Sequence, residues 1–303
     1  MANPDQHDVD SNAAASVATG VPNQPVRRGV LFRAVRLVLV ALVMFYLGIC
    51  GLMYCFQRKL VYLPPVRATQ QVLRLAQQGR LELWKNLKGD CVGMKRLSAS
   101  GLAEASVLIC YGNGGSATGC AYYADALQSI APLDVFILQY PGYEDRPGSP
   151  SRETLLSAAV EALQLIETNR PIFLLGESLG TGVAAYLAGN FADRVSAVLL
   201  LSPYERLADV AQFQYPYLPA RGLMRDDLWS GKYLQTYRGP LGVMVDGQDR
   251  VVPEKFGRRL YQQFTGPKRL WEFPECGHIQ IGSPAEKFWR EAVEFWREAN
   301  HSK

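Results

Sequence analysis

A serine between two glycines is the first feature of the sequence that could do chemistry. Gly176-Glu177-Ser178-Leu179-Gly180 follows the short apolar run 172–175 and precedes a run of small residues of helical character. A strand, a sharp turn and a helix in this order can expose a serine hydroxyl in a strained turn, because the glycines allow neighbouring chain to pass closely. The motif alone also fits an incidental serine in a buried turn, but its strand and helix context favours a nucleophile.

A serine hydroxyl is a weak nucleophile unless a base takes its proton, and His278 is the predicted base. The chain has three histidines, of which His7 lies in a polar N-terminal stretch and His301 is third from the end. His278 follows directly after a predicted strand. A lone histidine can also be structural, but no other internal histidine is present to serve the serine.

The imidazole of a serine hydrolase also needs a carboxylate that fixes its tautomer and stabilises its protonated form. Two candidates, Asp246 and Asp249, follow the apolar run 241–245. We expect Asp249 to take this role because it lies further into the loop, and Asp246 to shape the turn. The resulting chain order of serine, aspartate and histidine is the order found in α/β-hydrolases.

The oxyanion that forms during acyl transfer needs hydrogen-bond donors. We predict that the backbone N–H of Leu179, just after the serine, is one donor. The Gly-rich stretch 111–115 supplies the other, with Asn113 the first candidate and Gly114 the second. This stretch could also be read as a phosphate-binding loop, but it lacks the Gly-Lys-Ser/Thr ending and the Gly-x-Gly-x-x-Gly spacing of such loops.

The N-terminal part of the chain carries a candidate membrane anchor. We expect residues 1–29 to form a disordered tail and residues 30–57 to form a transmembrane signal anchor, because Leu37–Phe56 is a run of 20 residues without a charge. That length spans a hydrocarbon core of about 30 Å. A buried core helix is a less suitable alternative because the run is so long. A cleaved signal peptide would have a shorter apolar region and a small-residue cleavage site.

The charges beside the predicted anchor indicate its orientation. Four cations precede the run and three follow it: Arg27, Arg28, Arg33 and Arg36, then Arg58, Lys59 and Arg67. The positive-inside bias therefore favours, narrowly, a cytoplasmic N-terminus and an extracytoplasmic catalytic domain. The cysteines do not indicate in which cellular compartment the domain lies, because those outside the anchor could pair or stay free: Cys91, Cys110, Cys120 and Cys276.

Composition limits the other classes of function. The net charge is +4, without a basic and aromatic stripe, so no nucleic acid partner is expected. No Cys-x-x-Cys or His-Glu-x-x-His spacing is present, so no metal site is expected.

The pattern of residues 58–303 predicts one α/β domain, in which short apolar strands alternate with helices. This alternation is typical of a mostly parallel sheet with helices on both faces. Residues 66–87 look weakly helical with a stop at Gly79, and Ser151 is expected to cap a helix. The segment 203–238 interrupts the alternation and is rich in aromatic residues, so we interpret it as a small cap over the strand ends. An ordinary surface excursion is the alternative.

Taken together, these motifs resemble the α/β-hydrolase superfamily, and within it the membrane-anchored branch of ABHD-type serine hydrolases. The resemblance extends from about Phe56 to the end of the chain and rests on these segments: Phe56–Pro65, Gly112–Gly115, Tyr140–Tyr143, Pro150-Ser151, Gly176–Gly180, Ser202–Tyr204, Tyr215–Pro219, Gly247–Pro253 and Gly277-His278. It implies an α/β-hydrolase fold, Ser178, Asp249 and His278 as nucleophile, acid and base, and no cofactor. The sequence departs from the family pattern at Tyr111, Thr181 and Asp246.

The leading hypothesis is a membrane-anchored serine hydrolase that cleaves carboxylic esters or thioesters of a small-molecule or lipid-like acyl substrate. A serine peptidase of the same fold is one alternative, because acyl transfer to water uses the same groups. A non-catalytic membrane-bound binding protein is the other, and the complete set of serine, aspartate and histidine argues against it.

Overall fold

The structure is a computed structural model of the 303-residue chain, and it describes residues 26–167, 169–279 and 285–301. The predicted disordered tail lies outside the described residues as far as position 25. The chain divides into two compact units, Met1–Ile49 and Cys50–Lys303.

Helix α1 (Val26–Val61) contributes to both units and carries the predicted anchor. Its stretch Gly29–Val61 has 33 residues, and the most apolar 18-residue window of that stretch has a mean hydropathy of 2.4 and is only 6 % buried. Within the part of the chain that the structure describes, this is the one helix that is long and apolar enough to cross a membrane. A core helix of a globular domain would be mostly buried instead.

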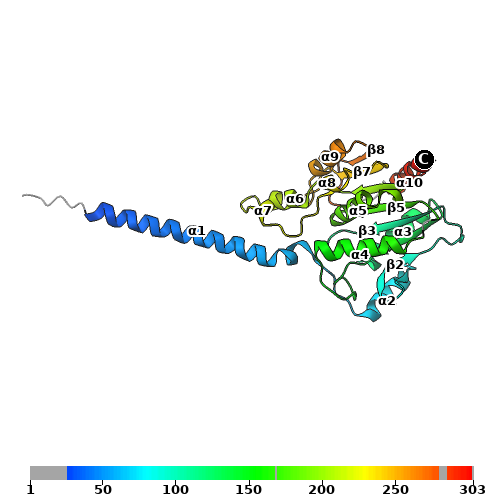
Figure 1. Cartoon of the computed structure of the whole chain (residues 1–303), viewed down its shortest axis with the longest axis horizontal. Coiled ribbons are helices and arrows are strands. Elements are labelled where there is room, and N and C mark those ends of the chain that lie inside the picture. The colour runs from blue at the N-terminus through cyan, green and yellow to red at the C-terminus, as the bar shows by residue number, and fades with distance from the viewer. Residues whose placement is uncertain (1–25, 168, 280–284, 302–303) are drawn as a thin grey trace, which may run out of the picture. The chain divides into compact units, whose positions relative to one another are not determined.

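The second unit is built on an eight-stranded sheet with the order β1-β2-β4-β3-β5-β6-β7-β8. Figure 1 labels five of these strands, β2, β3, β5, β7 and β8. The pairs β1·β2 and β2·β4 are antiparallel and the other five pairs are parallel. The strands are β1 (Glu82–Lys85), β2 (Cys91–Arg96), β3 (Ala105–Cys110), β4 (Leu133–Leu138), β5 (Ile172–Glu177), β6 (Ala197–Leu201), β7 (Leu241–Asp246) and β8 (Lys268–Phe273). The mostly parallel sheet predicted from the sequence is therefore confirmed.

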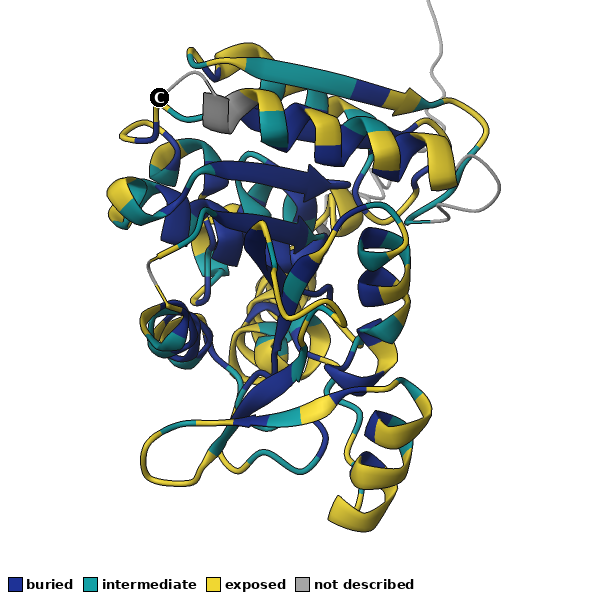
Figure 2. Cartoon of the chain, turned by 90° about the vertical axis from the view of Figure 1, so that its right-hand side faces the viewer, coloured by how far each residue is buried: buried dark blue, intermediate teal, exposed yellow. Residues whose placement is uncertain are grey.

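Helices cover both faces of this sheet. Every residue of β3, β6 and β7 is buried, which requires cover on both sides, and the central strands are dark blue in Figure 2. Helix α3 packs against α10, whereas α5 packs against α4 and α8. The helices are α2 (Thr69–Gln78), α3 (Ala121–Gln128), α4 (Arg152–Leu165), α5 (Leu179–Asn190), α6 (Leu207–Gln214), α7 (Ala220–Leu223), α8 (Ser230–Tyr233), α9 (Glu254–Gln263) and α10 (Ala285–His301), with short 3-10 turns η1 (Thr118–Cys120) and η2 (Ala192–Arg194).

Local signals set several helix ends as expected. The Ser151 hydroxyl accepts from the Thr154 amide at 3.1 Å and the Thr154 hydroxyl accepts from the Ser151 amide at 2.9 Å, which forms a reciprocal N-terminal cap of α4. Helix α2 ends before Gly79, whose amide donates to the Leu75 carbonyl at 2.9 Å. Both caps confirm the sequence prediction.

The helical interpretation of residues 66–87 holds only as far as the predicted stop at Gly79. Residues Glu82–Lys85 form strand β1, which pairs antiparallel with β2. Trp84 is the buried residue of this strand, and its ring centroid lies 4.8 Å from that of Phe136 on β4. The strand exists because β2 supplies its hydrogen-bond partners, and that partner is not visible in a four-residue pattern.

The predicted cap segment, residues 203–238, contains three short helices, α6, α7 and α8. Its aromatic residues divide between two environments. Tyr204 is fully buried, whereas Tyr217 is 89 % exposed and Phe213 and Tyr215 are also exposed. The segment therefore anchors one end in the core and presents apolar rings at its surface.

The end of α1 is bound to this cap segment within the second unit. The Gln57 side-chain amide donates to the Leu223 carbonyl at 3.0 Å and accepts from the Arg225 amide at 2.7 Å. The Arg58 guanidinium donates to both carboxylate oxygens of Asp226, at 2.7 and 3.2 Å. We call residues 57–67, which continue from here into the domain, the tether.

All six cysteines are unpaired in the structure, which answers the question that the sequence left open for Cys91, Cys110, Cys120 and Cys276. Cys110 lies at the end of β3 and is completely buried, and this burial raises the pKa of its thiol to about 12. A thiol held neutral in this way behaves as a small apolar core residue.

A substitution at Gly180 tests the close packing of α5 against the end of β3. A Cβ atom on Gly180 would lie 1.9 Å from the Cys110 carbonyl oxygen, and no rotamer change can relieve an overlap with backbone. We expect Gly180→Ala to lower the free energy of unfolding by about 3 kcal/mol. Gly222→Ala is the matched control, because no atom lies within 4 Å of its Cβ position. Gly222→Ala should change the free energy of unfolding by less than about 1 kcal/mol. Thermal unfolding of the detergent-solubilised proteins measures both, and equal melting temperatures would contradict the close approach.

Candidate active site

Ser178 stands in a sharp turn between β5 and α5. Its backbone has φ 48° and ψ −115°, a conformation that non-glycine residues rarely adopt. Neighbouring elements hold it there. Its amide donates to the Leu201 carbonyl at 2.9 Å, and its carbonyl accepts from the Thr181 amide at 2.9 Å and from the Thr181 hydroxyl at 2.6 Å. Ser178 is 7 % exposed.

The structure brings the three predicted catalytic residues together. His278 Nε2 lies 3.1 Å from Ser178 Oγ, and His278 Nδ1 lies 2.6 Å from Asp249 Oδ2. The Asp249 side chain is completely buried, and its Oδ1 accepts from the Val251 and Val252 amides at 2.8 Å each. A carboxylate fixed on one oxygen by two amides can turn only the other oxygen to the imidazole. This arrangement suits an aspartate that orients a histidine.

Asp246 has a different environment, in line with the expectation that it shapes the turn. Its Oδ2 accepts from the Ser202 hydroxyl at 2.6 Å and from the Ile279 amide at 3.1 Å. Burial raises the pKa of Asp246, and these two hydrogen bonds oppose that rise. Because Ile279 follows His278 and has φ 53°, the hydrogen bond from its amide fixes the loop that carries the imidazole.

The two predicted oxyanion residues lie beside the serine. Leu179 is the first residue of α5, so its amide belongs to the group that finds no partner inside the helix. Asn113 follows Gly112, and a Cβ atom on Gly112 would lie 3.2 Å from Ser178 Cβ. The Asn113 side chain is engaged elsewhere, since its Oδ1 accepts from the Leu63 amide at 2.8 Å. The backbone amide of Asn113 is the group that we predict to bind the oxyanion.

The contact between Leu63 and Asn113 was not predicted from the sequence. It joins the tether to the loop after β3 across 50 positions of the chain. The tether then continues past the buried Glu144, whose amide donates to the Pro65 carbonyl at 2.6 Å and whose side chain accepts from Arg67 at 2.9 Å. The only sequence signal was the Phe56–Pro65 segment, which says nothing about what it contacts.

Glu177, inside the serine motif, was also missed. Its Oε2 accepts from the Tyr123 hydroxyl at 2.5 Å and from the Tyr122 hydroxyl at 3.2 Å. Burial raises the pKa of Glu177, while the two tyrosines and the positive charge of protonated His278 act in the opposite direction. A charged residue at the end of an otherwise apolar strand was the signal that could have identified it.

The structure offers no candidate metal centre in the residues it describes. Within residues 26–167, 169–279 and 285–301, no group of three or more histidine, cysteine, aspartate or glutamate side chains is placed to hold a metal ion.

Comparison with known proteins agrees with this fold. A family model described as alpha/beta hydrolase fold matches residues 105–224. An uncharacterized protein of Mycobacterium tuberculosis (strain H37Rv) is 32 % identical over 240 residues, which cover 76 % of this chain and 83 % of that protein. This chain belongs to the α/β-hydrolase family. The fold and the family predicted from the sequence are therefore confirmed.

More distant similarities refine the placement within this family. A protein of Danio rerio named lysophosphatidylserine lipase ABHD12 is 27 % identical over 185 residues, which cover 54 % of this chain and 48 % of that protein. It supports the predicted ABHD-type branch. The structure of the Butyrivibrio proteoclasticus protein Est1E with ferulic acid has a TM-score of 0.55 and 15 % identity, covering 70 % of this chain and 100 % of that one. At this identity the likeness shows the fold alone.

The two aspartates of the β7 loop provide a matched test of the predicted acid. We expect Asp249→Asn to lower kcat by about 10⁴-fold, because the amide would favour the wrong imidazole tautomer. Asp246→Asn keeps an oxygen for Ser202 and Ile279, and we expect it to lower kcat by less than about tenfold. Hydrolysis of p-nitrophenyl butyrate by the purified proteins compares them. A larger loss for Asp246→Asn would reverse the assignment.

Glu177→Gln should change the pH dependence of the reaction. Ionised Glu177 attracts the protonated form of His278, so its removal disfavours that form. The acid limb of the kcat/KM profile should then move to lower pH. Glu286→Gln, on the exposed surface of α10, is the control and should leave the profile in place. A shift of the acid limb to higher pH would show that the carboxylate does not act on His278 in this way.

Proposed function

We propose that this protein is a membrane-anchored serine hydrolase that cleaves carboxylic ester or thioester bonds through an acyl-enzyme at Ser178. The observation that supports this most directly is the hydrogen-bonded series from Ser178 Oγ through His278 to Asp249, at 3.1 and 2.6 Å. Membership of a hydrolase family and similarity to proteins named as lipases agree with it.

The first half of the proposed reaction forms the acyl-enzyme. Ser178 Oγ attacks the carbonyl carbon of the substrate while His278 Nε2 takes the hydroxyl proton. The buried Asp249 stabilises the imidazolium, and the amides of Leu179 and Asn113 donate to the oxyanion. The tetrahedral intermediate collapses, the bond to the alcohol or thiol breaks, and His278 returns the proton to that leaving group.

The second half releases the acid. His278 removes a proton from a water molecule, whose oxygen attacks the acyl carbon, and the second tetrahedral intermediate returns Ser178 to its starting state. The proton passes back to Ser178 through the imidazole. Each step uses side chains and amides of this chain, and none requires a cofactor.

We also propose the predicted domain arrangement. Residues 30–57 form a single-pass signal anchor, and residues 58–303 form a hydrolase domain on the extracytoplasmic side, with residues 203–238 as its cap. The exposed apolar surface of α1 supports the anchor, and the charges that flank the run support the orientation.

The cap and the anchor together favour an apolar acyl substrate presented at the membrane. The exposed aromatic rings of the cap lie in the same unit as the end of α1, and both suit an apolar acyl chain better than a soluble polar one. A small-molecule ester or a lipid-like ester therefore fits the proposal.

Labelling with a fluorophosphonate probe tests the proposed nucleophile. Membranes that contain the wild type should be labelled, because an activated serine attacks the probe irreversibly. Ser178→Ala should remove the labelling entirely, and His278→Ala should slow it by about three orders of magnitude or more. Labelling that survives Ser178→Ala, or that is absent from folded wild type, contradicts the proposal.

The same samples test the anchor. The labelled band should stay in the membrane pellet after alkaline carbonate washing, which removes peripheral proteins. A membrane-impermeant probe should label intact cells if the domain is extracytoplasmic. A labelled band in the soluble fraction would leave the hydrolase assignment intact and overturn the anchor.

A further inference from the structure

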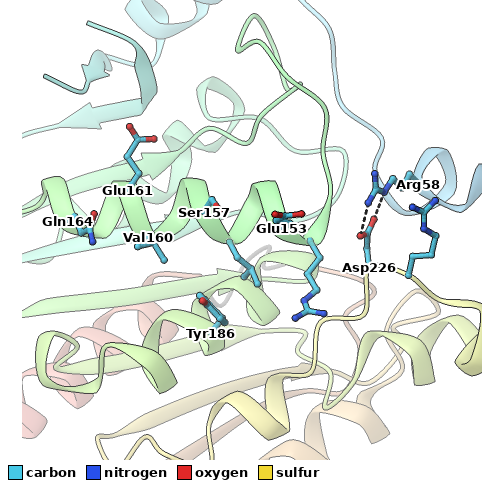
Figure 3. Close-up of a pocket in the computed structure, with 11 residues that line it drawn as sticks. Arg58, Glu153, Ser157, Val160, Glu161, Gln164, Tyr186 and Asp226 are labelled. Atoms are coloured by element: carbon cyan, nitrogen blue, oxygen red, sulfur yellow. Dashed lines mark hydrogen bonds and ion pairs between the residues drawn. The ribbon is translucent and has the colours of Figure 1, made fainter. Parts of the chain in front are cut away.

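A cavity of about 660 Å³ lies away from Ser178, between α4, α5 and the end of α1. None of the three predicted catalytic residues lines it. Figure 3 shows Arg58 and Asp226 at one end of it, with Glu153, Ser157 and Glu161 along α4. Two further arginines, Arg152 and Arg225, complete its wall. We call it the arginine cavity.

Three arginines and three carboxylates line the arginine cavity, so its formal charges balance, but they are not all paired with one another. Asp226 is already bound by Arg58, at 2.7 and 3.2 Å, and Glu161 pairs with Arg146 at 3.3 Å. Among the described residues, Arg152 and Arg225 make no ion pair. They share the cavity with one carboxylate that makes no ion pair among the described residues, Glu153, because Glu161 is paired with an arginine outside the lining.

With the proposed anchor in the membrane, the position of the cavity along α1 matches the depth of lipid headgroups. The charge-free run ends at Phe56, and a rise of about 1.5 Å per residue puts Arg58 about 3 Å beyond it. The headgroup layer on each side of the hydrocarbon core is about 5–7 Å thick. Arg225 also reaches this level, since its guanidinium lies 5.4 Å from the ring centre of Tyr54 on α1.

We propose that the arginine cavity binds the phosphate group of an anionic membrane lipid. The inference rests on the proposed membrane anchor. A guanidinium presents a planar fork of donors that matches two phosphate oxygens, and Arg152 and Arg225 have this fork free of carboxylate partners. Asp226 holds Arg58 in place beside them. The hydroxyls of Ser157 and Tyr186 supply neutral donors on the same wall for the rest of a headgroup.

Native mass spectrometry of the full-length protein in detergent tests this site. Phosphatidylglycerol is the anionic probe and phosphatidylcholine the zwitterionic one. The wild type should retain phosphatidylglycerol in preference. R152Q/R225Q should weaken that retention by at least about tenfold, since one hydrogen bond to a charged group is worth about this factor. Phosphatidylcholine retention should not change.

A matched variant controls for the loss of two charges. R238Q/R290Q removes two exposed arginines that lie outside the cavity, and it should bind phosphatidylglycerol like the wild type. Unchanged melting temperatures show that each variant folds. Equal phosphatidylglycerol retention by the wild type and R152Q/R225Q would overturn the proposal.

Two further arms separate the possible explanations. Inorganic phosphate that binds with the same arginine dependence, without any preference for the lipid, would make the cavity a site for a free anion and would overturn the lipid assignment. Ser178→Ala should retain phosphatidylglycerol as the wild type does, because Ser178 does not line the cavity. Lipid binding and fluorophosphonate labelling therefore fail independently.

Discussion

The left-handed backbone of Ser178 is the constraint on which the rest of the site depends. A residue at φ 48° persists only where its surroundings determine it, and here three elements do so. The last carbonyl of β6 accepts a hydrogen bond from the Ser178 amide, and Thr181 of α5 donates two hydrogen bonds to the Ser178 carbonyl. Gly180 lets α5 approach the end of β3. The strain at one residue is thus offset by the packing of the central sheet, and the serine hydroxyl is held in a fixed place.

The other groups of the site lie in loops that follow different strands, and separate hydrogen bonds fix each loop. The loop after β7 holds Asp249 by two amides, and the loop after β8 holds His278 through the hydrogen bond from Ile279 to Asp246. The loop after β3 is held by Leu63 of the tether. Preorganisation of this kind lets an active site stabilise developing charge without rearranging during the reaction. Two aspartates three positions apart correspondingly have different hydrogen-bond partners.

The sequence was informative where a signal is local or where few residues of one type exist. Ser178 lies in a motif with a strand before it and a helix after it, and His278 is the one internal histidine, so both could be placed by inspection. Strand β1 could not, because its pairing with β2 is tertiary. The Glu177–Tyr123 and Leu63–Asn113 hydrogen bonds join residues 54 and 50 positions apart, and no local pattern encodes such partners.

The bond between Arg58 and Asp226 has a practical consequence for work on the isolated domain. The side chain of Asp226 is only 8 % exposed, and Arg58, which pairs with it, lies in the last turns of α1. A shortened, water-soluble chain that begins after Val61 would keep Ser178, Asp249 and His278 but would leave this carboxylate without its partner. An unpaired buried charge is costly, so the segment around α7 would loosen in such a fragment. The smallest fragment that keeps this ion pair therefore includes the final turns of α1.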